Sequence, residues 1–471
     1  MICSGAATFL TNDISTLCGV MRVGSSRKST YKIFRIQCGT LDETTDAPES
    51  NTVSQQGDGQ GTALQRTPSL TDSPGSTRGT TKERIKKLKE KSAARAATGD
   101  LVMYPPDEQR RIKSSWARLM RWSRNLRQRE AARANEVRLE KVVVFGGGSF
   151  GTAMGSALAK LHPQLEVVLL LRDPYLCKDI NDKHYNTRYL PDYELPSRVS
   201  ATTSAEAALR GAQYAIHAVP VQHSRAFLTS IKQYIDPSLP IISVSKGIEV
   251  STGKVMSDLI PSALERRQPM VFLSGPSFAK EVMDERPTGL VAASRDKALC
   301  REVQNLFASP IMRINITTDV IGVEICGALK NVLAIAAGIV EGLELGNNAM
   351  AALISQGCSE IRWLAEKMGA KPATISGLSG LGDIMLTCYG SLSRNRSVGV
   401  RLGKGEALSD IMASSSQVAE GVPTAGAVVS LARKYRVQLP VLTAVAQVLN
   451  GHLSAAEAVA EIMNLPQIEE R

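Results

Sequence analysis

The chain has 471 residues, more than one compact domain usually holds, so we expect two folded domains together with additional sequence. Apolar residues make up 43% of the chain and aromatic residues 4%, which is enough to build a large core. The formal net charge of +11 is concentrated in residues 81–140, which hold 17 Lys or Arg and 8 Asp or Glu. The remainder is nearly neutral, and we expect no nucleic-acid partner.

The sequence gives no indication of a membrane-spanning protein, a metal-dependent protein or a disulfide-rich protein. The longest apolar run, Val332–Val340, is about half of the roughly 18 residues that a membrane-spanning helix needs, so no span is predicted. The 8 cysteines are scattered, with no C-x-x-C pair and no neighbouring His cluster. They predict neither a disulfide framework nor a metal site.

Residues 1–80 are interpreted as a transit-peptide-like and disordered segment. No acidic residue occurs from Ile14 to Leu41, whereas basic residues are spread there among Ser, Thr and small side chains. This composition is typical of an organelle transit peptide, with an ordinary disordered tail as the alternative. Residues 42–80 carry few large apolar groups and are predicted to be disordered.

Residues 81–138 form a basic extension that is either helical or disordered. Helix-forming residues alternate with dense Lys and Arg, and Trp116, Leu119, Met120 and Trp122 lie close together around Arg118. The pattern is compatible with a surface helix that contacts an anionic membrane, RNA or another protein. The alternative is a solvated or disordered linker.

From Leu139 onward, short apolar runs alternate with segments of helical length. The predicted strands cover residues 139–145, 167–171, 214–219, 240–245 and 270–273, and the first helix covers 152–161. This alternation predicts an α/β fold, with a Rossmann domain over residues 139–318 whose parallel sheet is covered on both faces. The later patterns are helical, at 319–341, 349–368, 424–435 and 439–471, so residues 319–471 are predicted to form an all-α domain.

A glycine motif follows the first predicted strand. Lys141–Phe145 leads into Gly146-Gly-Gly-Ser-Phe-Gly151, a G-x-G-x-x-G sequence that opens the first helix. In this context Gly146 permits a tight turn, Gly148 allows the backbone to approach a pyrophosphate, and Gly151 allows helix and strand to pack closely. The pyrophosphate would rest on the free amides of the helix N-terminus. The motif therefore predicts a bound nicotinamide dinucleotide.

The residues that select between NAD and NADP lie at the end of the second strand. Here the sequence reads Leu171-Arg172-Asp173. Arg172 suits a 2′-phosphate or the adenine face, whereas Asp173 suits the ribose 2′-hydroxyl. The choice stays open at this level, with a mild preference for NAD.

Lys330 is the candidate acid/base. It is the single charged residue between Glu324 and Glu341 in an otherwise apolar helix. Burial lowers the pKa of a lysine, which makes it a suitable proton donor to a developing alkoxide. A lone lysine in such a helix can also reach the surface with its ammonium group.

Polar residues that suit an anionic substrate follow later in the chain. A glycine-rich turn presents Asp383 and Thr387, and Ser393, Arg394 and Asn395 combine hydroxyl, guanidinium and amide donors for a phosphate. A structural salt-bridge cluster is the alternative. Just past two strands lie Lys246 and the pair Gly275 and Ser277, which are either substrate contacts or parts of ordinary turns.

Read in order, the motifs F-G-G-G-S-F-G-T-A, S-K-G-I, G-P-S-F-A, V-E-I-C-G-A-L-K-N-V, G-L-G-D, S-R-N-R and V-A-E-G-V resemble NAD(P)-dependent sn-glycerol-3-phosphate dehydrogenases. The resemblance covers about residues 139–467. With the transit-like N-terminus, it is most similar to the plastid form of plants and algae, which supplies glycerol 3-phosphate for glycerolipid synthesis. That family interconverts dihydroxyacetone phosphate and glycerol 3-phosphate, and we expect a homodimer.

The resemblance implies a role for each matching residue. Lys330 matches the catalytic acid/base. The substrate positions implied are Lys246, Gly275, Ser277, Asn331, Asp383, Thr387, Ser393, Arg394 and Asn395. The cofactor positions implied are Gly146, Gly148, Ser149, Phe150, Gly151, Arg172, Lys246, Ala279, Arg394, Val418 and Glu420.

Two rival functions and one other cellular location remain as alternatives to this interpretation. A related dehydrogenase of the same architecture would act on a 3-hydroxy acid or on 6-phosphogluconate, and the S-R-N-R and G-L-G-D motifs argue against it. The other rival is an inactive nucleotide-sensing or lipid-surface scaffold, against which the presence of Lys330, Lys246 and Asp383 argues. The expected location is the chloroplast stroma, with the cytoplasm as the alternative.

Overall fold

The computed structural model describes residues 86–87, 90, 104–134, 139–415 and 418–466. The predicted transit-like and disordered segments lie outside these residues. Helix α2 (Pro106–Ala134) occupies much of the basic extension, and Asp107 and Glu108 stand in its first turn, where acidic side chains complement the helix dipole.

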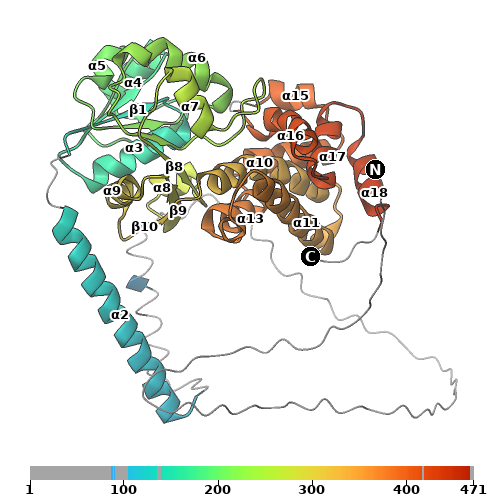
Figure 1. Ribbon diagram of the computed structural model, residues 1–471, viewed down its shortest axis with the longest axis horizontal. Helices are drawn as coiled ribbons and strands as arrows, with labels where there is room; N and C mark the ends of the chain where they lie inside the picture. The colour runs from blue at the N-terminus through green and yellow to red at the C-terminus, as the bar shows by residue number, and fades with distance from the viewer. Residues whose placement is uncertain (1–85, 88–89, 91–103, 135–138, 416–417, 467–471) are drawn as a thin grey trace, which may run out of the picture. The chain divides into compact units, whose positions relative to one another are not determined.

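An eight-stranded sheet forms the core of the first domain (Figure 1), with strand order β10-β9-β8-β7-β6-β1-β2-β5. All neighbouring strands are parallel except β8 and β9, which pair antiparallel. The strands are β1 (Lys141–Phe145), β2 (Glu166–Leu170), β5 (Val199–Thr202), β6 (Tyr214–His217), β7 (Ile241–Ser243), β8 (Met270–Ser274), β9 (Thr288–Ala293) and β10 (Met312–Thr317). A separate hairpin pairs β3 (Tyr185–Asn186) with β4 (Leu190–Glu194).

Helices cover both faces of this sheet because successive residues of a strand point to opposite faces. Val142 and Val144 pack in one core with α3 (Ser149–Leu161), α4 (Pro174–Lys183), α8 (Ala279–Met283) and α9 (Lys297–Phe307). Val143 and Phe145 pack in the other with α5 (Ala205–Leu209), α6 (Val221–Ile231) and α7 (Met256–Leu264), and the short helix η1 (Lys232–Tyr234) follows α6. The doubly covered, mostly parallel sheet confirms the predicted Rossmann architecture.

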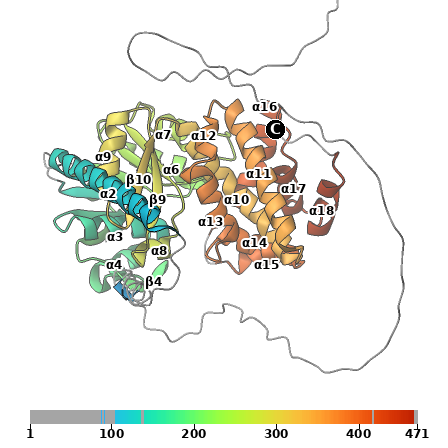
Figure 2. The same cartoon turned by 90° about the horizontal axis from the view of Figure 1, so that it is seen from below.

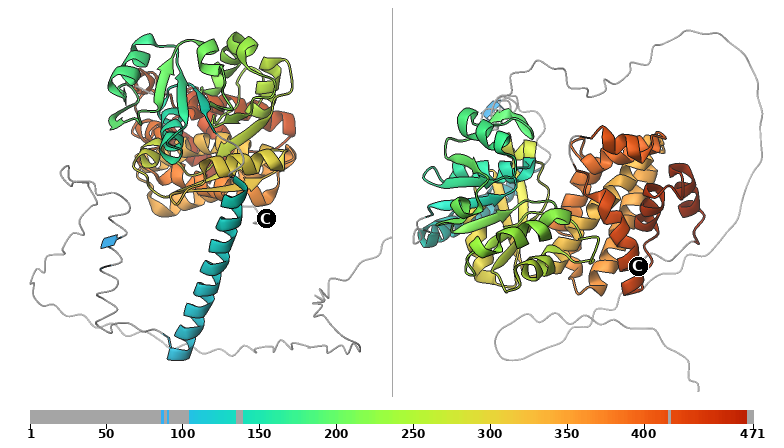
Figure 3. Two further views of the ribbon diagram at one scale, coloured as in Figure 1. Left: turned by 90° about the vertical axis from the view of Figure 1, so that its left-hand side faces the viewer. Right: turned by 90° about the horizontal axis from the view of Figure 1, so that it is seen from above.

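The second domain is helical and is built around α10 (Val320–Gly342), which Figure 2 shows among its neighbours. By length and apolarity α10 could cross a membrane, but 89% of the relevant window is buried inside the protein, as for a core helix. Around it lie α11 (Gly346–Lys367), α12 (Pro372–Ile375), η2 (Leu378–Gly382), α13 (Asp383–Tyr389), α14 (Arg394–Gly403), α15 (Leu408–Ala413), α16 (Gly421–Tyr435), α17 (Pro440–Leu449) and α18 (Ala455–Met463). Figure 3 shows this domain beside the sheet domain.

Small residues let α14 cross α10 at close range. A Cβ atom on Gly338 would overlap the carbonyl oxygen of Arg396, and one on Gly399 would overlap that of Ile335. The close crossing matters for function because it sets α14, which begins with the S-R-N-R motif, directly against the helix that carries Lys330.

The structure adds strands that the apolar runs did not predict. They are β5 and β10 at the two edges of the sheet, β9 beside β10, and the short pair β3 and β4. The edge strands are short and half polar, with Arg313 and Asn315 exposed along β10, and β9 contains Gly289 and two alanines, which are depleted in strands. The helix expected from residue 439 onward is wrong as one element. It breaks after Leu449, where Gly451 adopts a φ of 72°, and α18 restarts with Ser454 and Glu457 in a capping box.

Candidate active site

The predicted site residues converge at one edge of the sheet. Because β8, β7, β6, β1 and β2 are parallel neighbours, their carboxyl ends lie side by side. The glycine loop follows β1, Lys246 follows β7 and Gly275 follows β8. Ligands of open α/β sheets bind at this edge.

Two lysines share one carboxylate beside this edge. Lys330 Nζ donates to Asp383 Oδ1 at 2.6 Å, and Lys246 Nζ donates to Asp383 Oδ2 at 2.8 Å. Lys330 Nζ also donates to Thr387 Oγ1 at 2.8 Å, and Lys246 Nζ to the Gly275 carbonyl at 3.3 Å. The side chains of Lys330, Asp383 and Lys246 are 8%, 1% and 16% exposed. Ionised groups so deeply buried need partners of this kind.

The local fold around Asp383 fixes this geometry. The glycine-rich turn η2 ends at Gly382, so that Asp383 opens α13, and Thr387 follows one helical turn later. The Thr387 hydroxyl donates to the Asp383 carbonyl at 2.6 Å and therefore presents a lone pair to Lys330. Both α13 residues thus hold the same ammonium group.

The electrostatics of the cluster set Lys330 apart from an ordinary lysine. Burial lowers the pKa of Lys330 to about 8, although the negative charge of Asp383 opposes this effect. For Asp383, burial raises the pKa, but the charges of Lys246 and Lys330 outweigh burial and hold the pKa below its usual value. At neutral pH the ammonium form of Lys330 is therefore paired with an ionised carboxylate.

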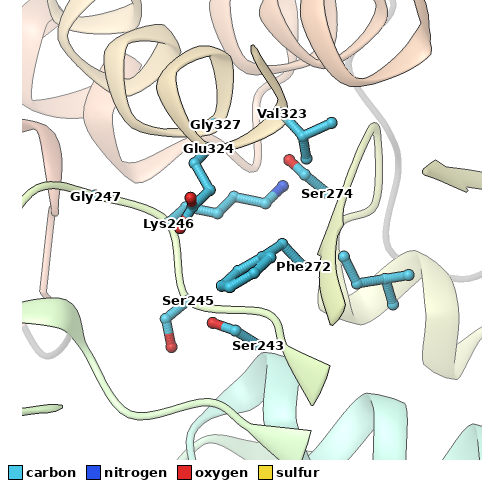
Figure 4. Close-up of a pocket in the computed structure, with 10 residues that line it drawn as sticks. Ser243, Ser245, Lys246, Gly247, Phe272, Ser274, Val323, Glu324 and Gly327 are labelled. Carbon is cyan, nitrogen blue, oxygen red and sulfur yellow. The ribbon is translucent and has the colours of Figure 1, made fainter. Parts of the chain in front are cut away.

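Figure 4 shows Lys246 in the small cavity that it lines at this edge of the sheet. Its side chain runs past Phe272 toward Ser274, beneath Gly327 of α10. A Cβ atom on Gly327 would stand 3.1 Å from Ser274 Oγ and 3.6 Å from Lys246 Cγ, so the absence of a side chain leaves the path for Lys246. Ser274 Oγ lies 3.4 Å from Asp383 Oδ2.

An asparagine pair links the lysine helix to the S-R-N-R motif. Asn395 Nδ2 donates to Asn331 Oδ1 at 3.0 Å, and Asn395 Oδ1 accepts the amide of Gly421 at 2.9 Å. Both asparagines are buried, and Asn395 keeps a second Nδ2 hydrogen for a ligand. The preceding Ser393 caps α14 by accepting the Arg396 amide at 3.3 Å.

The segment before α16 lines a second pocket, and Arg394 contacts this segment. Arg394 Nη1 donates to the Val418 carbonyl at 3.2 Å. Lys246, Val418 and Glu420 line one pocket together with residues of the turn that begins α6. Burial raises the pKa of Glu420 to about 7, while Arg394 and the two lysines of the cluster lower it.

The glycine loop has the shape that a diphosphate requires. Gly146 adopts a φ of 97°, a conformation that favours glycine, and a Cβ atom on Gly151 would stand 2.8 Å from that of Ala218. By contrast, a Cβ atom on Gly148 would meet open space, and Gly148 is the N-cap of α3. The first amides of α3 therefore face a cradle without a side chain, which fits a pyrophosphate.

The remaining predicted residues lie around this loop and the next strand end. Ser149 Oγ donates to the Tyr189 carbonyl at 3.3 Å, and Phe150 packs against the sheet core. Near Gly275, Ser277 Oγ donates to that residue's carbonyl at 3.0 Å, and Ala279 is the first residue of α8.

At the expected adenosine end, Arg172 is exposed just after β2. Asp173 caps α4: its Oδ1 accepts the amides of Tyr175 and Leu176, and its Oδ2 lies 3.6 Å from Arg188. One oxygen of Asp173 is thus used by the helix, while the second faces a guanidinium that sequence reasoning had not considered.

Sequence reasoning also missed Asn186, which supports the glycine loop. Its Nδ2 donates to the Gly147 carbonyl and to Thr152 Oγ1, both at 2.9 Å, and its Oδ1 accepts the Tyr189 amide at 3.1 Å. The side chain is fully buried. A single asparagine in a two-residue strand gives no signal in the sequence, because its partners are 34 and 39 residues away.

No group of three His, Cys, Asp or Glu arranged to hold a metal occurs among the residues that the structure describes. The cysteines described, at positions 177, 300, 326, 358 and 388, are all free thiols.

Comparison with known proteins shows the family to which the chain belongs. The model described as NAD-dependent glycerol-3-phosphate dehydrogenase N-terminus matches residues 141–300, and the corresponding C-terminus model matches residues 319–460. A chloroplastic glycerol-3-phosphate dehydrogenase [NAD(+)] of Arabidopsis thaliana is 59% identical over 372 residues, which cover 79% of this chain and 88% of the relative. The chloroplastic enzyme of Oryza sativa subsp. japonica is 59% identical over 360 residues, 76% of this chain and 82% of the relative.

Solved structures agree with the sequence relatives. The crystal structure of glycerol-3-phosphate dehydrogenase from Coxiella burnetii matches with a TM-score of 0.67 and 33% identity, over 69% of this chain and 99% of that chain. The Saccharomyces cerevisiae enzyme matches with a TM-score of 0.60 and 26% identity, over 69% and 99% of the two chains.

Proposed function

Because the chain belongs to the NAD-dependent glycerol-3-phosphate dehydrogenase family, we propose that its lysine–aspartate cluster catalyses the reversible reduction of dihydroxyacetone phosphate to glycerol 3-phosphate. The chain is an NAD-dependent oxidoreductase. The single observation that carries the assignment of the site is the buried Lys330–Asp383–Lys246 cluster, which Asn331 links to Asn395 of α14.

The cofactor is held by the loop and the pocket described above. The α3 amides behind Gly148 take the pyrophosphate, and Arg172 borders the adenosine end. Lys246, Val418 and Glu420 border the end near the cluster, since they line one pocket. When bound, the reduced nicotinamide supplies the hydride.

The substrate's phosphate is bound by α14. Arg394 offers a planar guanidinium, and Asn395 offers the amide hydrogen that Asn331 leaves free. Ser393 caps this helix and so fixes the position of Arg394, the first residue of the helix. Binding the phosphate, which does not react, aligns the carbonyl carbon with the cofactor and reduces the entropy that must be lost at the reacting centre.

Lys330 then handles the proton. As hydride reaches C2 of the ketone, the C2 oxygen gains negative charge, and Lys330 Nζ donates its proton to that oxygen. Asp383 and Lys246 orient the C1 hydroxyl and the carbonyl, and Asp383 holds the ammonium form of Lys330 ready before the reaction. In the oxidative direction the neutral amine of Lys330 accepts the proton of the C2 hydroxyl.

A substrate comparison tests this assignment. Reduction of NAD⁺ is measured with glycerol 3-phosphate, a 3-hydroxy acid and 6-phosphogluconate, and oxidation of NADH and of NADPH is measured with dihydroxyacetone phosphate. We expect turnover with glycerol 3-phosphate and dihydroxyacetone phosphate alone. No turnover with these two, or faster turnover with one of the other acids, would refute the assignment.

We further propose that the enzyme acts in the chloroplast, as the names of its two plant relatives state for them. A fusion of residues 1–80 to a fluorescent protein tests this, because a purely cytosolic signal would contradict it.

We also propose a homodimer. Leu381, Met385 and Tyr389 follow one another at helical spacing and are 40%, 50% and 52% exposed, which supports a covered face. Light scattering that gives the mass of one chain would contradict the dimer.

A further inference from the structure

Helix α2 takes no part in the reaction derived above. Both family matches lie beyond it, since the first begins at residue 141 and α2 ends at Ala134. Its sequence nevertheless has a strong pattern. The residues from Gln109 to Gln128 include seven Lys or Arg and no Asp or Glu, and two of the three tryptophans of the chain lie among them.

One side of α2 is apolar. At about 3.6 residues per turn, Ile112, Trp116 and Leu119 fall in one stripe, and Trp122 borders it. These side chains are 50%, 62%, 48% and 61% exposed. Two large indole rings and two aliphatic side chains in one exposed stripe are uncommon on a soluble helix, and they favour burial against another phase or surface.

The other side of α2 is cationic. Arg110, Arg121 and Arg124 lie opposite the apolar stripe, and Arg118 and Lys113 stand on its flanks. Among these groups, Arg110 pairs with Asp107 in the first helical turn. The apolar stripe is therefore bordered on both sides by positive charge.

We propose that α2 docks the enzyme on the surface of an anionic lipid bilayer. A bilayer surface suits both halves of the pattern: the acyl region receives the apolar stripe, tryptophan prefers the interface, and the anionic headgroups attract the arginines. Arginine stems can cross the boundary while their guanidinium groups stay among the headgroups. RNA would pair with the arginines but would leave the aliphatic residues Ile112 and Leu119 in water, so the bilayer accounts for more of the helix.

The test uses the full chain and vesicles. Binding is measured by co-sedimentation with vesicles of phosphatidylcholine alone and with vesicles in which roughly one third of the lipid is phosphatidylglycerol. We expect binding to the anionic vesicles that is at least about tenfold stronger and that weakens as salt is added. Equal binding to both vesicles, or binding to neither, would overturn the proposal.

Two variants separate the two faces. Replacing three cations, in R118Q/R121Q/R124Q, is expected to weaken binding on the order of 100-fold. The double variant W116S/L119S is expected to lose binding as well, although all the charges remain. Turnover of dihydroxyacetone phosphate should be unchanged in both, since neither variant touches the folded body, so docking and catalysis are tested separately.

A matched control removes the same charge elsewhere. Arg301, Arg433 and Lys434 are exposed on α9 and α16, and the variant R301Q/R433Q/K434Q should bind vesicles like the parent chain. An equal loss of binding in this control would overturn the role of α2, because net charge alone would then explain the effect.

Fluorescence gives an independent readout. The third tryptophan of the chain is Trp363, so W363F leaves emission from α2 alone. A shift of that emission to shorter wavelength with anionic vesicles is expected as the indoles enter the interface. Binding without such a shift, together with tighter binding to a polyuridylate probe than to vesicles, would replace the lipid surface by RNA.

Discussion

Replacement of Lys330 by alanine tests the core of the proposed mechanism. The side chain makes two hydrogen bonds, to Asp383 at 2.6 Å and to Thr387 at 2.8 Å, and it is the proposed proton donor. A positioned general acid contributes about 10²–10⁴-fold in rate. We therefore expect turnover to fall by that factor, which corresponds to about 3–5 kcal/mol in the activation barrier.

The same substitution should cost much less stability than activity. Asp383 is not left alone, because Lys246 Nζ stays 2.8 Å from Oδ2 and Ser274 Oγ stays 3.4 Å away. The cost should therefore lie below the roughly 3–5 kcal/mol that follows when a buried charge loses its one partner. A domain of ordinary stability, about 5–15 kcal/mol, remains folded after such a loss.

Three measurements distinguish these effects. Turnover is followed by NADH absorbance with dihydroxyacetone phosphate, NADH affinity by fluorescence titration, and stability by thermal unfolding. NADH should bind K330A as it binds the parent, because the glycine loop is intact. Lys367 is exposed at the end of α11, so K367A serves as the matched control with normal turnover. A K330A variant that keeps turnover within about tenfold of the parent would refute the role of Lys330.

The other predictions concern pH, the glycine loop and helix packing. Burial lowers the pKa of Lys330 to about 8, and reduction needs its ammonium form, so kcat/KM for reduction should fall as pH rises through about 8. Oxidation needs the neutral amine, so kcat/KM for oxidation should rise over the same range. A flat pH profile in both directions would contradict this prediction. N186A removes the two hydrogen bonds that Asn186 donates to Gly147 of the glycine loop and to Thr152, which follows the loop. The KM for NADH should rise about tenfold, with a smaller change in kcat. An effect on kcat alone would argue against a positioning role for Asn186. G338A forces α14 away from α10 and should lower the free energy of unfolding by about 1–3 kcal/mol or more, as denaturant titration would show; unchanged stability would contradict the close crossing.

The fold was largely predictable because its signals are local. The Val-rich run before Gly146, the glycine spacing and the change from strand-length to helix-length apolar patterns all act over a few residues. The edge strand β10 and the break between α17 and α18 were missed for a physical reason. Their patterns are short, and pairing with β9 and a capping box decide them.

The site was predictable only in part, because its contacts join distant segments. Lys246 and Asp383 are 137 residues apart, and Lys330 and Asp383 are 53 apart, so no spacing rule links them. Their residue types and the family resemblance suggested a common site, and the fold brings them within hydrogen-bond distance. Asn186 and Arg188 had no comparable signal, since an asparagine or arginine in a polar hairpin is ordinary.

The shared carboxylate explains why these three residues must act as a unit. Burial alone would drive Lys330 to its neutral form, and a neutral amine cannot donate a proton to the ketone oxygen. Asp383 opposes burial and keeps the ammonium form populated near neutral pH, while Lys246 repels the same charge and limits that effect. The pKa near 8 is thus a balance of opposing terms from three elements: the end of β7, α10 and α13. D383N removes the opposing charge but keeps the shape of the side chain. It should therefore lower the pH at which kcat/KM for reduction falls, while the fold is unchanged.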